Sequence, residues 1–406
     1  MASNTTRVSV FRSPDFLRFY VGQSLSYVGD GLRTLAIPLL VFRLTGSALS
    51  LGVTFALEIV PFALFSLVGG SLADRLDRRR LMLACDAVRF AIMVLFSLAF
   101  ATGQLTLPLL YTGVVLLSVC AAIFLGCQSS SIPYLLGKDR AKPAVAALSA
   151  TEQGVNMIAP PIGRALFALV GPLPALVLNA CTYLTSQVSI ALVRDFGPEH
   201  PSGVPDGAVI AADIVTGWRF IMRDAALRAL SFSQFGINFF GIIGFVAFIP
   251  YLKREFGASD QAVGLAFGSL AVGSVLGAIV SARTHWPFGR AITLAFIVDG
   301  LLWSPTIWTH SLGVAMVSMA AAAACGSYEI TSLIAWRMRI IPEDMVGRVF
   351  GVIRLIVLIG MLPGSLIGGY VGDHYGTRAA MLVSTLGFFA MALVLFTMKS
   401  LRNDRR

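Results

Sequence analysis

The sequence predicts an all-α membrane protein whose twelve transmembrane helices form two six-helix bundles. Hydrophobic residues make up 56% of the 406 residues and charged residues only 13%, whereas soluble domains carry about a quarter charged residues. The hydrophobic residues are collected in long runs. The longest polar stretch, residues 194–227, divides these runs into two equal sets. We therefore expect lipid, rather than water, to surround most of the chain.

Each hydrophobic run is long enough to cross a bilayer, which requires about 20 apolar residues per helix. Turn-forming sequences such as Pro287-Phe288-Gly289 separate the runs. The predicted spans are 17–43, 48–73, 81–102, 106–135, 144–169, 173–193, 228–252, 261–282, 291–308, 311–335, 347–371 and 379–398. In the span 261–282, Gly268, Gly273 and Gly277 have the small-residue spacing that favours close helix packing.

The distribution of Lys and Arg predicts that both termini are cytoplasmic. Most of the 31 basic residues lie in loops and tails on the side of the N-terminus. The loops on the opposite side contain only Arg43, Lys253, Arg254 and Arg378. Cytoplasmic loops of membrane proteins are enriched in these cations, and anionic lipids are their expected partners.

The polar stretch 194–227 is predicted to link an N-terminal bundle, residues 1–193, to a C-terminal bundle, residues 228–406. Its first part contains Gly197, Pro198 and Pro201, which interrupt a helix. Its second part mixes apolar and charged residues: Ile214, Trp218, Phe220 and Ile221 among Asp213, Arg219, Arg223 and Asp224. This pattern predicts an amphipathic helix on the inner leaflet. A plain tether is the alternative.

Composition and motifs exclude several function classes. The net charge of +10 comes from clusters between apolar runs, which is typical of loops facing anionic lipid and not of a nucleic-acid interface. The five cysteines all lie inside apolar runs, so we expect small buried side chains and neither a disulfide nor a metal site. A nucleotide-binding Gly-x-x-x-x-Gly-Lys-Ser/Thr sequence is absent. We therefore expect no cofactor and no enzymatic activity.

The loop between the second and third spans reads Gly70-Ser-Leu-Ala-Asp74-Arg75-Leu-Asp77-Arg78-Arg79-Arg80. It resembles the signature loop of the major facilitator superfamily, in which Gly, Asp-Arg, Gly and basic residues follow one another. Asp77 departs from this pattern, because the family usually has Gly there. Strings such as Phe16-Leu-Arg-Phe-Tyr-Val-Gly-Gln23 and Pro342-Glu-Asp-Met-Val-Gly-Arg348 are similar to the bacterial efflux branch that includes macrolide efflux proteins and the enterobactin exporter.

The resemblance implies the major facilitator fold and a gating role for the signature loop. It implies that Asp74 faces the start of the eleventh span, near Gly347, where a helix N-terminus favours a carboxylate. The basic residues Arg75, Arg78, Arg79 and Arg80 would then pair with carboxylates and lipid phosphates.

The fifth span resembles the antiporter motif of the superfamily, whose core is Gly-Pro-x-x-Gly-Gly. It contains Gly154 and the string Ala159-Pro160-Pro161-Ile162-Gly163-Arg164. Ala159 and Arg164 replace two of the glycines, and the fourth span lacks the Arg that many drug–proton antiporters place there. The resemblance thus implies transport and leaves proton antiport open.

Charged residues inside the spans are costly in a bilayer and are candidates for function. Asp30 and Arg33 lie three residues apart on one helix face, and a carboxylate at this depth suits proton exchange or cation recognition. Asp86 and Arg89 repeat the spacing, and we expect them to hold helices together. The remaining candidates are Glu58, Glu152, Asp299, Glu329 and Arg354, of which Glu329 and Arg354 are expected to form an inter-helix pair.

The chain contains 28 Phe and 13 Met residues, and soft apolar surfaces suit bulky amphipathic substrates. Tyr27, Phe235, Asn238, Phe239 and Phe240 lie near the middle of spans that line the cavity in the resembled family. We predict a monomeric exporter of drug-like amphipathic molecules in the bacterial inner membrane, driven by proton antiport, with alternating access of the two bundles. The alternatives are export of a siderophore or lysolipid, or a non-transporting receptor on the same fold.

Overall fold

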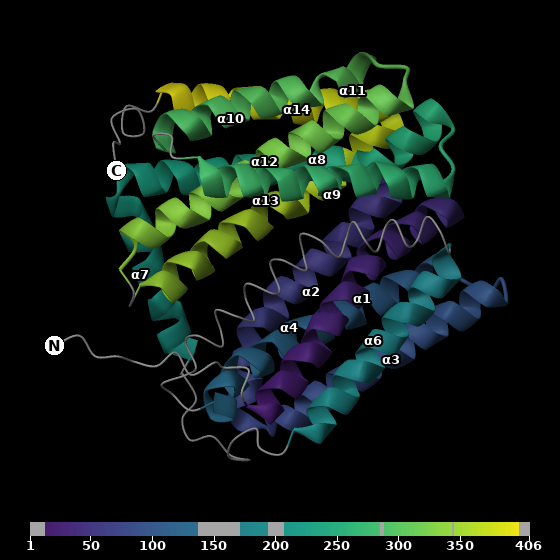
Figure 1. Cartoon of the computed structure of the whole chain (residues 1–406), viewed down its shortest axis with the longest axis vertical. Coiled ribbons are helices and arrows are strands. Elements are labelled where there is room, and N and C mark those ends of the chain that lie inside the picture. The colour runs from purple at the N-terminus through teal and green to yellow at the C-terminus, as the bar shows by residue number, and fades with distance from the viewer. Residues whose placement is uncertain (1–12, 137–170, 194–206, 285–287, 343–344, 398–406) are drawn as a thin grey trace. The chain divides into compact units, whose positions relative to one another are not determined.

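The computed structural model describes residues 13–136, 171–193, 207–284, 288–342 and 345–397. Within these ranges every regular element is a helix (Figure 1). The helices are α1 (Pro14–Thr45), α2 (Ala48–Arg75), α3 (Arg78–Ala101), α4 (Leu107–Leu136), α6 (Pro172–Leu192), α7 (Gly207–Arg223), α8 (Ala225–Phe256), α9 (Asp260–Arg283), α10 (Phe288–Trp303), α11 (Pro305–Trp308), α12 (Leu312–Ile340), α13 (Val346–His374) and α14 (Thr377–Thr397).

Every predicted span within the described residues corresponds to a helical segment, and α7 lies in the predicted linker. Ten of them are long and apolar enough to cross a membrane, and the predicted span 291–308 appears as a shorter apolar helical segment, Ile292–Trp308. The predicted span 144–169 lies outside the described residues, as do Glu152, Gly154, Pro160, Pro161 and Gly163. The prediction of an all-helical membrane protein is confirmed.

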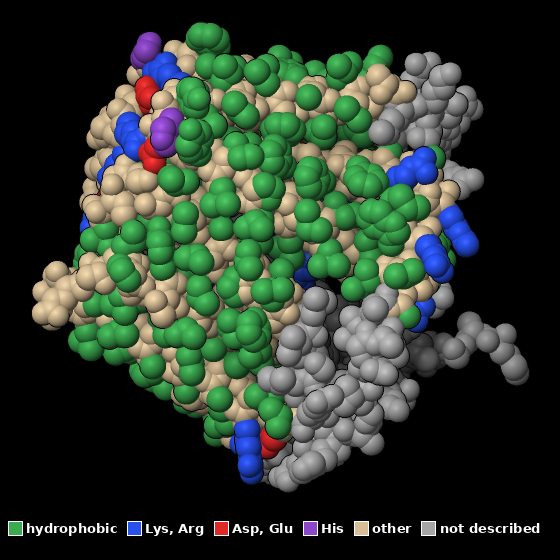
Figure 2. All heavy atoms as spheres, turned by 180° about the vertical axis from the view of Figure 1, so that it is seen from behind, with side chains coloured by type: hydrophobic (Ala, Val, Ile, Leu, Met, Phe, Trp, Pro, Cys, Tyr) green, Lys and Arg blue, Asp and Glu red, His purple; other side chains and the backbone are tan. Residues whose placement is uncertain are grey.

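The outer surface of the helices is apolar, as a lipid environment requires. Figure 2 shows hydrophobic side chains over most of the visible face, with the charged side chains gathered near its margins. Val272 on α9 is 63% exposed and Leu393 on α14 is 65% exposed. Large exposed apolar patches promote aggregation in water, whereas lipid tails solvate them.

Contacts divide the chain into two compact units, which we describe separately. Unit 1 comprises Met1–Thr34, Pro61–Gly163 and Pro172–Val204, and unit 2 comprises Leu35–Val60, Arg164–Gly171 and Pro205–Arg406. Helices α1 and α2 therefore contribute to both units, because the residues around the turn between them belong to unit 2. The predicted division into bundles at residues 194–227 stays a prediction.

In unit 1, α3 packs against α4 and α6. Their shared core contains Phe16 and Phe19 from α1 together with Met82 from α3 and Phe124 from α4. Three cysteines belong to the same core, and none of them is in a disulfide: Cys85, Cys120 and Cys127. These cysteines act as small apolar side chains that fill space between helices.

In unit 2, the amphipathic segment forms helix α7, which packs against α8 and α13. Ile221 is fully buried there, and Ile214 and Phe220 pack against the same core. Trp218 remains 41% exposed and meets Phe232 edge-on, with 6.1 Å between ring centroids. We predicted that the apolar face of this helix lies on lipid. Ile214, Phe220 and Ile221 pack against protein, whereas Val215 and Trp218 are exposed, and the position of α7 at the inner leaflet stays a prediction.

Two of the three glycines singled out in α9 lie against α12. A Cβ atom at Gly273 or Gly277 would overlap the carbonyl oxygen of Ala320 or Ala324, whereas nothing lies within 4 Å of one at Gly268. The backbones of α9 and α12 therefore approach each other at Gly273 and Gly277, as small residues allow between membrane helices.

We expect Gly277→Ala to lower the melting temperature of the purified protein, because the added methyl group overpacks the α9–α12 contact at a cost of about 1–3 kcal/mol. Gly268→Ala is the matched control on the same helix. It should leave the melting temperature unchanged or raise it, since Ala favours a helix over Gly by about 1 kcal/mol. Thermal unfolding in detergent measures both, and equal melting temperatures would contradict the close contact.

Candidate functional site

Asp30, the leading candidate from the sequence, has two polar partners in unit 1. Its Oδ1 accepts a hydrogen bond of 2.5 Å from the hydroxyl of Tyr183 on α6. The Nε of Arg33 lies 3.5 Å from the same oxygen, as the three-residue spacing predicts. The Asp30 side chain remains 32% exposed. A carboxylate that is paired and still partly open is available to exchange a proton or contact a cationic group.

Asp86 and Arg89 on α3 form a second pair, almost fully buried. Arg89 Nη1 lies 3.5 Å from Asp86 Oδ1, and the hydroxyl of Ser186 donates to Asp86 Oδ2 at 2.7 Å. The guanidinium of Arg89 also lies over the rings of Phe124 and Tyr183, at 5.0 and 5.5 Å from their centroids. Tyr183 thus contacts both pairs, with its hydroxyl on Asp30 and its ring facing Arg89.

Two further contacts extend this polar cluster along α1. Gln128 on α4 donates to the hydroxyl of Tyr27 at 2.9 Å, and Gln23 donates to the hydroxyl of Ser186 at 3.0 Å. We call the whole set the Asp30 network: Gln23, Tyr27, Asp30, Arg33, Asp86, Arg89, Gln128, Tyr183 and Ser186. Its two carboxylates and two guanidinium groups balance in charge, which lowers the cost of burying them.

The signature loop lies at the turn between α2 and α3. The side chain of Asp77 accepts hydrogen bonds from the backbone N–H groups of Arg79 and Arg80, at 2.9 and 3.2 Å. Asp77, where the family usually has Gly, therefore caps the N-terminus of α3. Arg79 donates to the carbonyl of Ala191 near the end of α6, where a helix favours positive charge. Arg78 is 6% exposed.

The other residues of the signature loop are described only in their backbone. Gly70, Asp74 and Arg75 lie within the helical range of α2, and their side chains are outside the described set. The expected contact between Asp74 and the start of the eleventh span stays a prediction.

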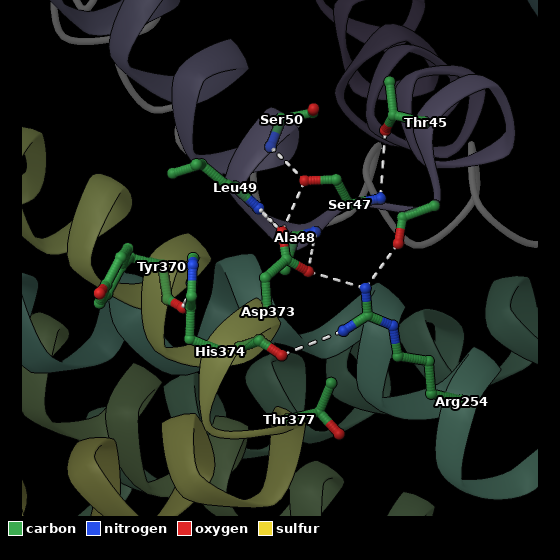
Figure 3. A network of polar contacts seen from close by, with 12 residues as sticks. Thr45, Ser47, Ala48, Leu49, Ser50, Arg254, Tyr370, Asp373, His374 and Thr377 are labelled. Atoms are coloured by element: carbon green, nitrogen blue, oxygen red, sulfur yellow. Dashed lines mark hydrogen bonds and ion pairs between the residues drawn. The ribbon is translucent and has the colours of Figure 1, made fainter.

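A second polar cluster lies in unit 2, where the end of α13 meets the start of α2 (Figure 3). Asp373 Oδ2 accepts hydrogen bonds from the hydroxyl of Ser47 at 2.6 Å and from the N–H of Leu49 at 2.9 Å. Its Oδ1 accepts one from the N–H of Ala48 at 2.9 Å. The first N–H groups of a helix have no partner within the helix, so the carboxylate of α13 satisfies those of α2.

Arg254 completes this arrangement from the end of α8. Its guanidinium donates to Asp373 Oδ1 at 2.7 Å, to the carbonyl of Gly46 at 2.5 Å and to that of Gly372 at 3.0 Å. Figure 3 shows Arg254 pointing toward Asp373 and the turn before Ala48. We call Ser47, Ala48, Leu49, Arg254 and Asp373 the Asp373 cluster.

The helices around the Asp373 cluster are in direct backbone contact. A Cβ atom at Gly369 of α13 would lie 2.7 Å from the carbonyl oxygen of Ala48. One at Gly52 of α2 would overlap the carbonyl oxygen of Ser365. Ala48 and Leu51 are fully buried. The polar contacts of Asp373 therefore lie beside closely packed backbone, with the Asp373 side chain 18% exposed and that of Arg254 36% exposed.

The four basic residues that the sequence assigns to the outer loops are all ion-paired in unit 2. Arg254 pairs with Asp373, and Arg378 pairs with Glu255 at 2.7 Å. Lys253 and Arg43 both pair with Asp260. Ion pairs with these three carboxylates offset the charge of the four cations, which is compatible with their predicted place in the outer loops.

The remaining predicted residues are distributed over unit 2. Glu58 is partly buried on α2. On α8, the rings of Phe235 and Phe239 are stacked with centroids 6.0 Å apart. Asn238 donates to the Gln234 carbonyl of its own helix at 2.8 Å. Their assignment to a substrate cavity stays a prediction.

The ionisable neighbour of Glu329 is not the one we expected. We expected an ion pair between Glu329 of α12 and Arg354 of α13. Glu329 is 2% exposed, and the charge that acts on it is that of Asp299 on α10, another carboxylate. Spacing along the chain could not reveal this neighbour, because α10 and α12 meet only in the folded unit.

Sequence reasoning missed Tyr183 and Asp373. Nothing in the sequence distinguished Tyr183 as a functional residue, since a Tyr in an apolar run is common. For Asp373 the sequence contains a signal: the spacing Gly369, Asp373, Gly376 and Arg378 repeats that of Gly70, Asp74, Asp77 and Arg79 in the signature loop. Within the described part of the chain, no group of three or more His, Cys, Asp or Glu residues is arranged to hold a metal ion.

Comparison with known proteins agrees with this architecture. The chain is 26% identical to the multidrug efflux pump Tap of Mycobacterium tuberculosis, covering 96% of this chain and 94% of that protein. It is 23% identical to the enterobactin exporter EntS of Salmonella choleraesuis, covering 94% and 91%.

Solved structures show the same fold. A bacterial homologue of the human lysosomal transporter Spinster superposes with a TM-score of 0.71 at 16% identity, covering 98% of this chain and 99% of that one. The nucleoside transporter NupG gives 0.70 at 11% identity, covering 96% and 99%. The model of the family described as transmembrane secretion effector matches residues 5–405. The chain therefore belongs to this family of major facilitator superfamily transporters, which are not enzymes.

Proposed function

We propose that the protein exports a bulky, drug-like amphipathic molecule from the bacterial cytoplasm by proton antiport with alternating access. The observation that carries this proposal is the Asp373 cluster. Asp373 and Arg254 belong to the predicted C-terminal bundle, and Ser47, Ala48 and Leu49 belong to the predicted N-terminal bundle. A polar contact between the two bundles at one end is what an alternating-access transporter makes in one state and breaks in the other.

The Asp30 network supports the coupling part of the proposal. Asp30 is held by Tyr183 and Arg33 and is still 32% exposed. An intramembrane carboxylate in contact with other polar groups is typical of proton relays in transporters.

The names of the relatives support an export function, and experiment has to identify the substrate class. Tap is named a multidrug efflux pump and EntS an enterobactin exporter. A siderophore or a lysolipid is therefore the alternative cargo, and both share the amphipathic character that a surface rich in Phe and Met accepts.

Ethidium efflux from cells that lack their own pumps tests the function. We expect cells that express the protein to lose ethidium faster than cells without it, and an uncoupler to abolish the difference. Asp30→Asn should remove the uncoupler-sensitive part, because the amide cannot exchange a proton. Competition by a macrolide, a catecholate siderophore or a lysolipid then identifies the preferred class.

Asp15→Asn is the matched control, since Asp15 and Arg18 form another pair on α1 with the same spacing, at 2.9 Å. This variant should transport like the wild type. Uncoupler-sensitive efflux by Asp30→Asn at the wild-type rate would disprove the coupling role of Asp30. Absence of movement for every probe would favour a receptor on this fold.

We expect Asp373→Asn to open the contact between α2 and α13. The change removes an ion pair and weakens three hydrogen bonds, at a cost of about 2 kcal/mol, which raises the open fraction by more than tenfold. Spin labels at the exposed residues Leu44 and Tyr375, with Cys181 replaced by Ser, report the distance between the two turns. A longer-distance population should grow in the variant.

Glu255→Gln is the control for this measurement. It breaks the ion pair with Arg378, which joins α8 to α14 inside the predicted C-terminal bundle. The distance distribution should then match that of the wild type. The same distribution for Asp373→Asn would show that Asp373 does not hold the two bundles together.

Both termini are proposed to be cytoplasmic, which places the Asp373 cluster at the outer face. Thr216→Cys on α7 and Tyr375→Cys after α13, both at exposed positions, test this in intact cells in which Cys181 is Ser. A membrane-impermeant maleimide should label only the Tyr375→Cys variant. Labelling of only the Thr216→Cys variant would show that the termini face the outside of the cell.

A further inference from the structure

Two carboxylates are buried inside unit 2, apart from the polar clusters described above. Asp299 of α10 is 3% exposed and Glu329 of α12 is 2% exposed. Helices α10 and α12 pack against each other, and the charge of Asp299 acts on Glu329. We call these two residues the Asp299–Glu329 pair.

Helix geometry directs both carboxyl groups to the same place. The Sγ of Cys325 on α12 contacts the carbonyl oxygen of Ala295 on α10 at 3.1 Å. Asp299 follows Ala295 by one turn and Glu329 follows Cys325 by one turn, so they share the faces that meet there. Side chains on a helix bend toward its N-terminus. Asp299 therefore bends toward Ala295 and Glu329 toward Cys325.

Among the described residues, neither carboxylate has a cation for a partner. Asp299 Oδ1 and Glu329 Oε1 are buried and accept no hydrogen bond, and no ion pair involves either residue within the described ranges. Trp303, one turn beyond Asp299, is a hydrogen-bond neighbour of that residue. Arg337, two turns beyond Glu329, donates instead to the carbonyl of Leu230 at 3.5 Å.

The helices packed around the pair carry their charges at their ends. Helices α8, α9, α11 and α14 contact α10 or α12, and α11 has no titratable side chain. The titratable side chains on these helices and on α12 itself are Arg228, Tyr251, Lys253, Arg254 and Glu255 on α8, Asp260 and Arg283 on α9, Arg378 on α14, and Cys325, Tyr328, Arg337 and Arg339 on α12. On α10, Arg290 lies near the start.

Two carboxylates in an apolar interior with no cation cannot both stay ionised, because burial and mutual repulsion each oppose the second charge. A hard metal cation would need about six oxygen ligands, and the pair supplies only two carboxyl groups. A proton needs only one oxygen to bind and a second to accept the hydrogen bond. Each carboxyl group has a buried oxygen without a hydrogen-bond partner, which is available to bind the proton.

We propose that the Asp299–Glu329 pair binds a proton and is a second site, besides Asp30, that takes up and releases a proton exchanged for substrate. The exchange rests on the export function proposed above, whereas proton binding does not. The proton comes from water on one side, is held as the O–H of one carboxyl group against the oxygen of the other, and leaves to water on the opposite side. No other bond forms or breaks.

Infrared difference spectroscopy of the purified full-length protein in lipid tests proton binding. Protonated carboxyl groups have a C=O band that carboxylates lack. We expect part of this band to disappear when the wild type is moved from neutral to alkaline buffer, and Asp299→Asn/Glu329→Gln to lack that part. The cap variant Asp224→Asn, which removes the carboxylate that accepts from Leu227 N–H at 2.8 Å, should keep it.

If the double variant loses as much of the C=O band in alkaline buffer as the wild type does, the proposal is overturned. If the double variant does not fold, the single variants decide, because the remaining carboxyl group loses its partner and its band shifts. Single-variant spectra identical to that of the wild type would equally reject the pair.

Proteoliposomes tested with ethidium separate coupling from proton binding. The double variant should still equilibrate ethidium down its gradient, while accumulation driven by a pH gradient falls to the level of protein-free liposomes. A merely structural role would impair both movements together. Accumulation at the wild-type level in the double variant would refute coupling through the pair. If the wild type itself moved no ethidium, the export proposal would fail for this probe, and the infrared comparison would still decide whether the pair binds a proton.

Discussion

The carboxylate of Asp373 at the start of α2 is the interaction on which the proposed cycle depends. It satisfies N–H groups that α2 cannot satisfy itself, and it does so from a helix more than 300 residues away in the chain. Arg254 ties the same carboxylate to α8. Because the backbones also touch at Gly369, α2 and α13 cannot separate without losing the polar and the packing contacts together. A discrete contact of this kind suits a transporter that alternates between two states.

The buried charges follow different rules in the two units. In unit 1 each carboxylate of the Asp30 network has an arginine beside it, so the ionised network is neutral. In unit 2 neither carboxylate of the Asp299–Glu329 pair forms an ion pair with another described residue, and burial then opposes the charged form of both. The proposed proton sites thus differ in surrounding: Asp30 is paired and partly exposed, whereas the Asp299–Glu329 pair is buried.

Much of the fold could be predicted from the sequence, because hydrophobic run length and the placement of Lys and Arg report directly on a bilayer. Pairs within one helix, such as Asp30 with Arg33, were equally accessible, since spacing alone brings them together. Contacts between helices could not be predicted from the sequence. Tyr183 on Asp30 and Asp299 beside Glu329 depend on which helix faces join, and periodicity does not determine that. Asp77 shows the opposite case, in which a departure from the family pattern has a local explanation as a helix cap.

The paired basic residues around the Asp373 cluster have an electrical consequence. Four cations there face three carboxylates, so these ion pairs together carry little net charge. The membrane potential acts on a moving part in proportion to its net charge, at about 2.3 kcal/mol per elementary charge for 100 mV. In the proposed cycle, separation of these helices would move little of this charge through that field, and the membrane potential would exert little direct force on the ion pairs.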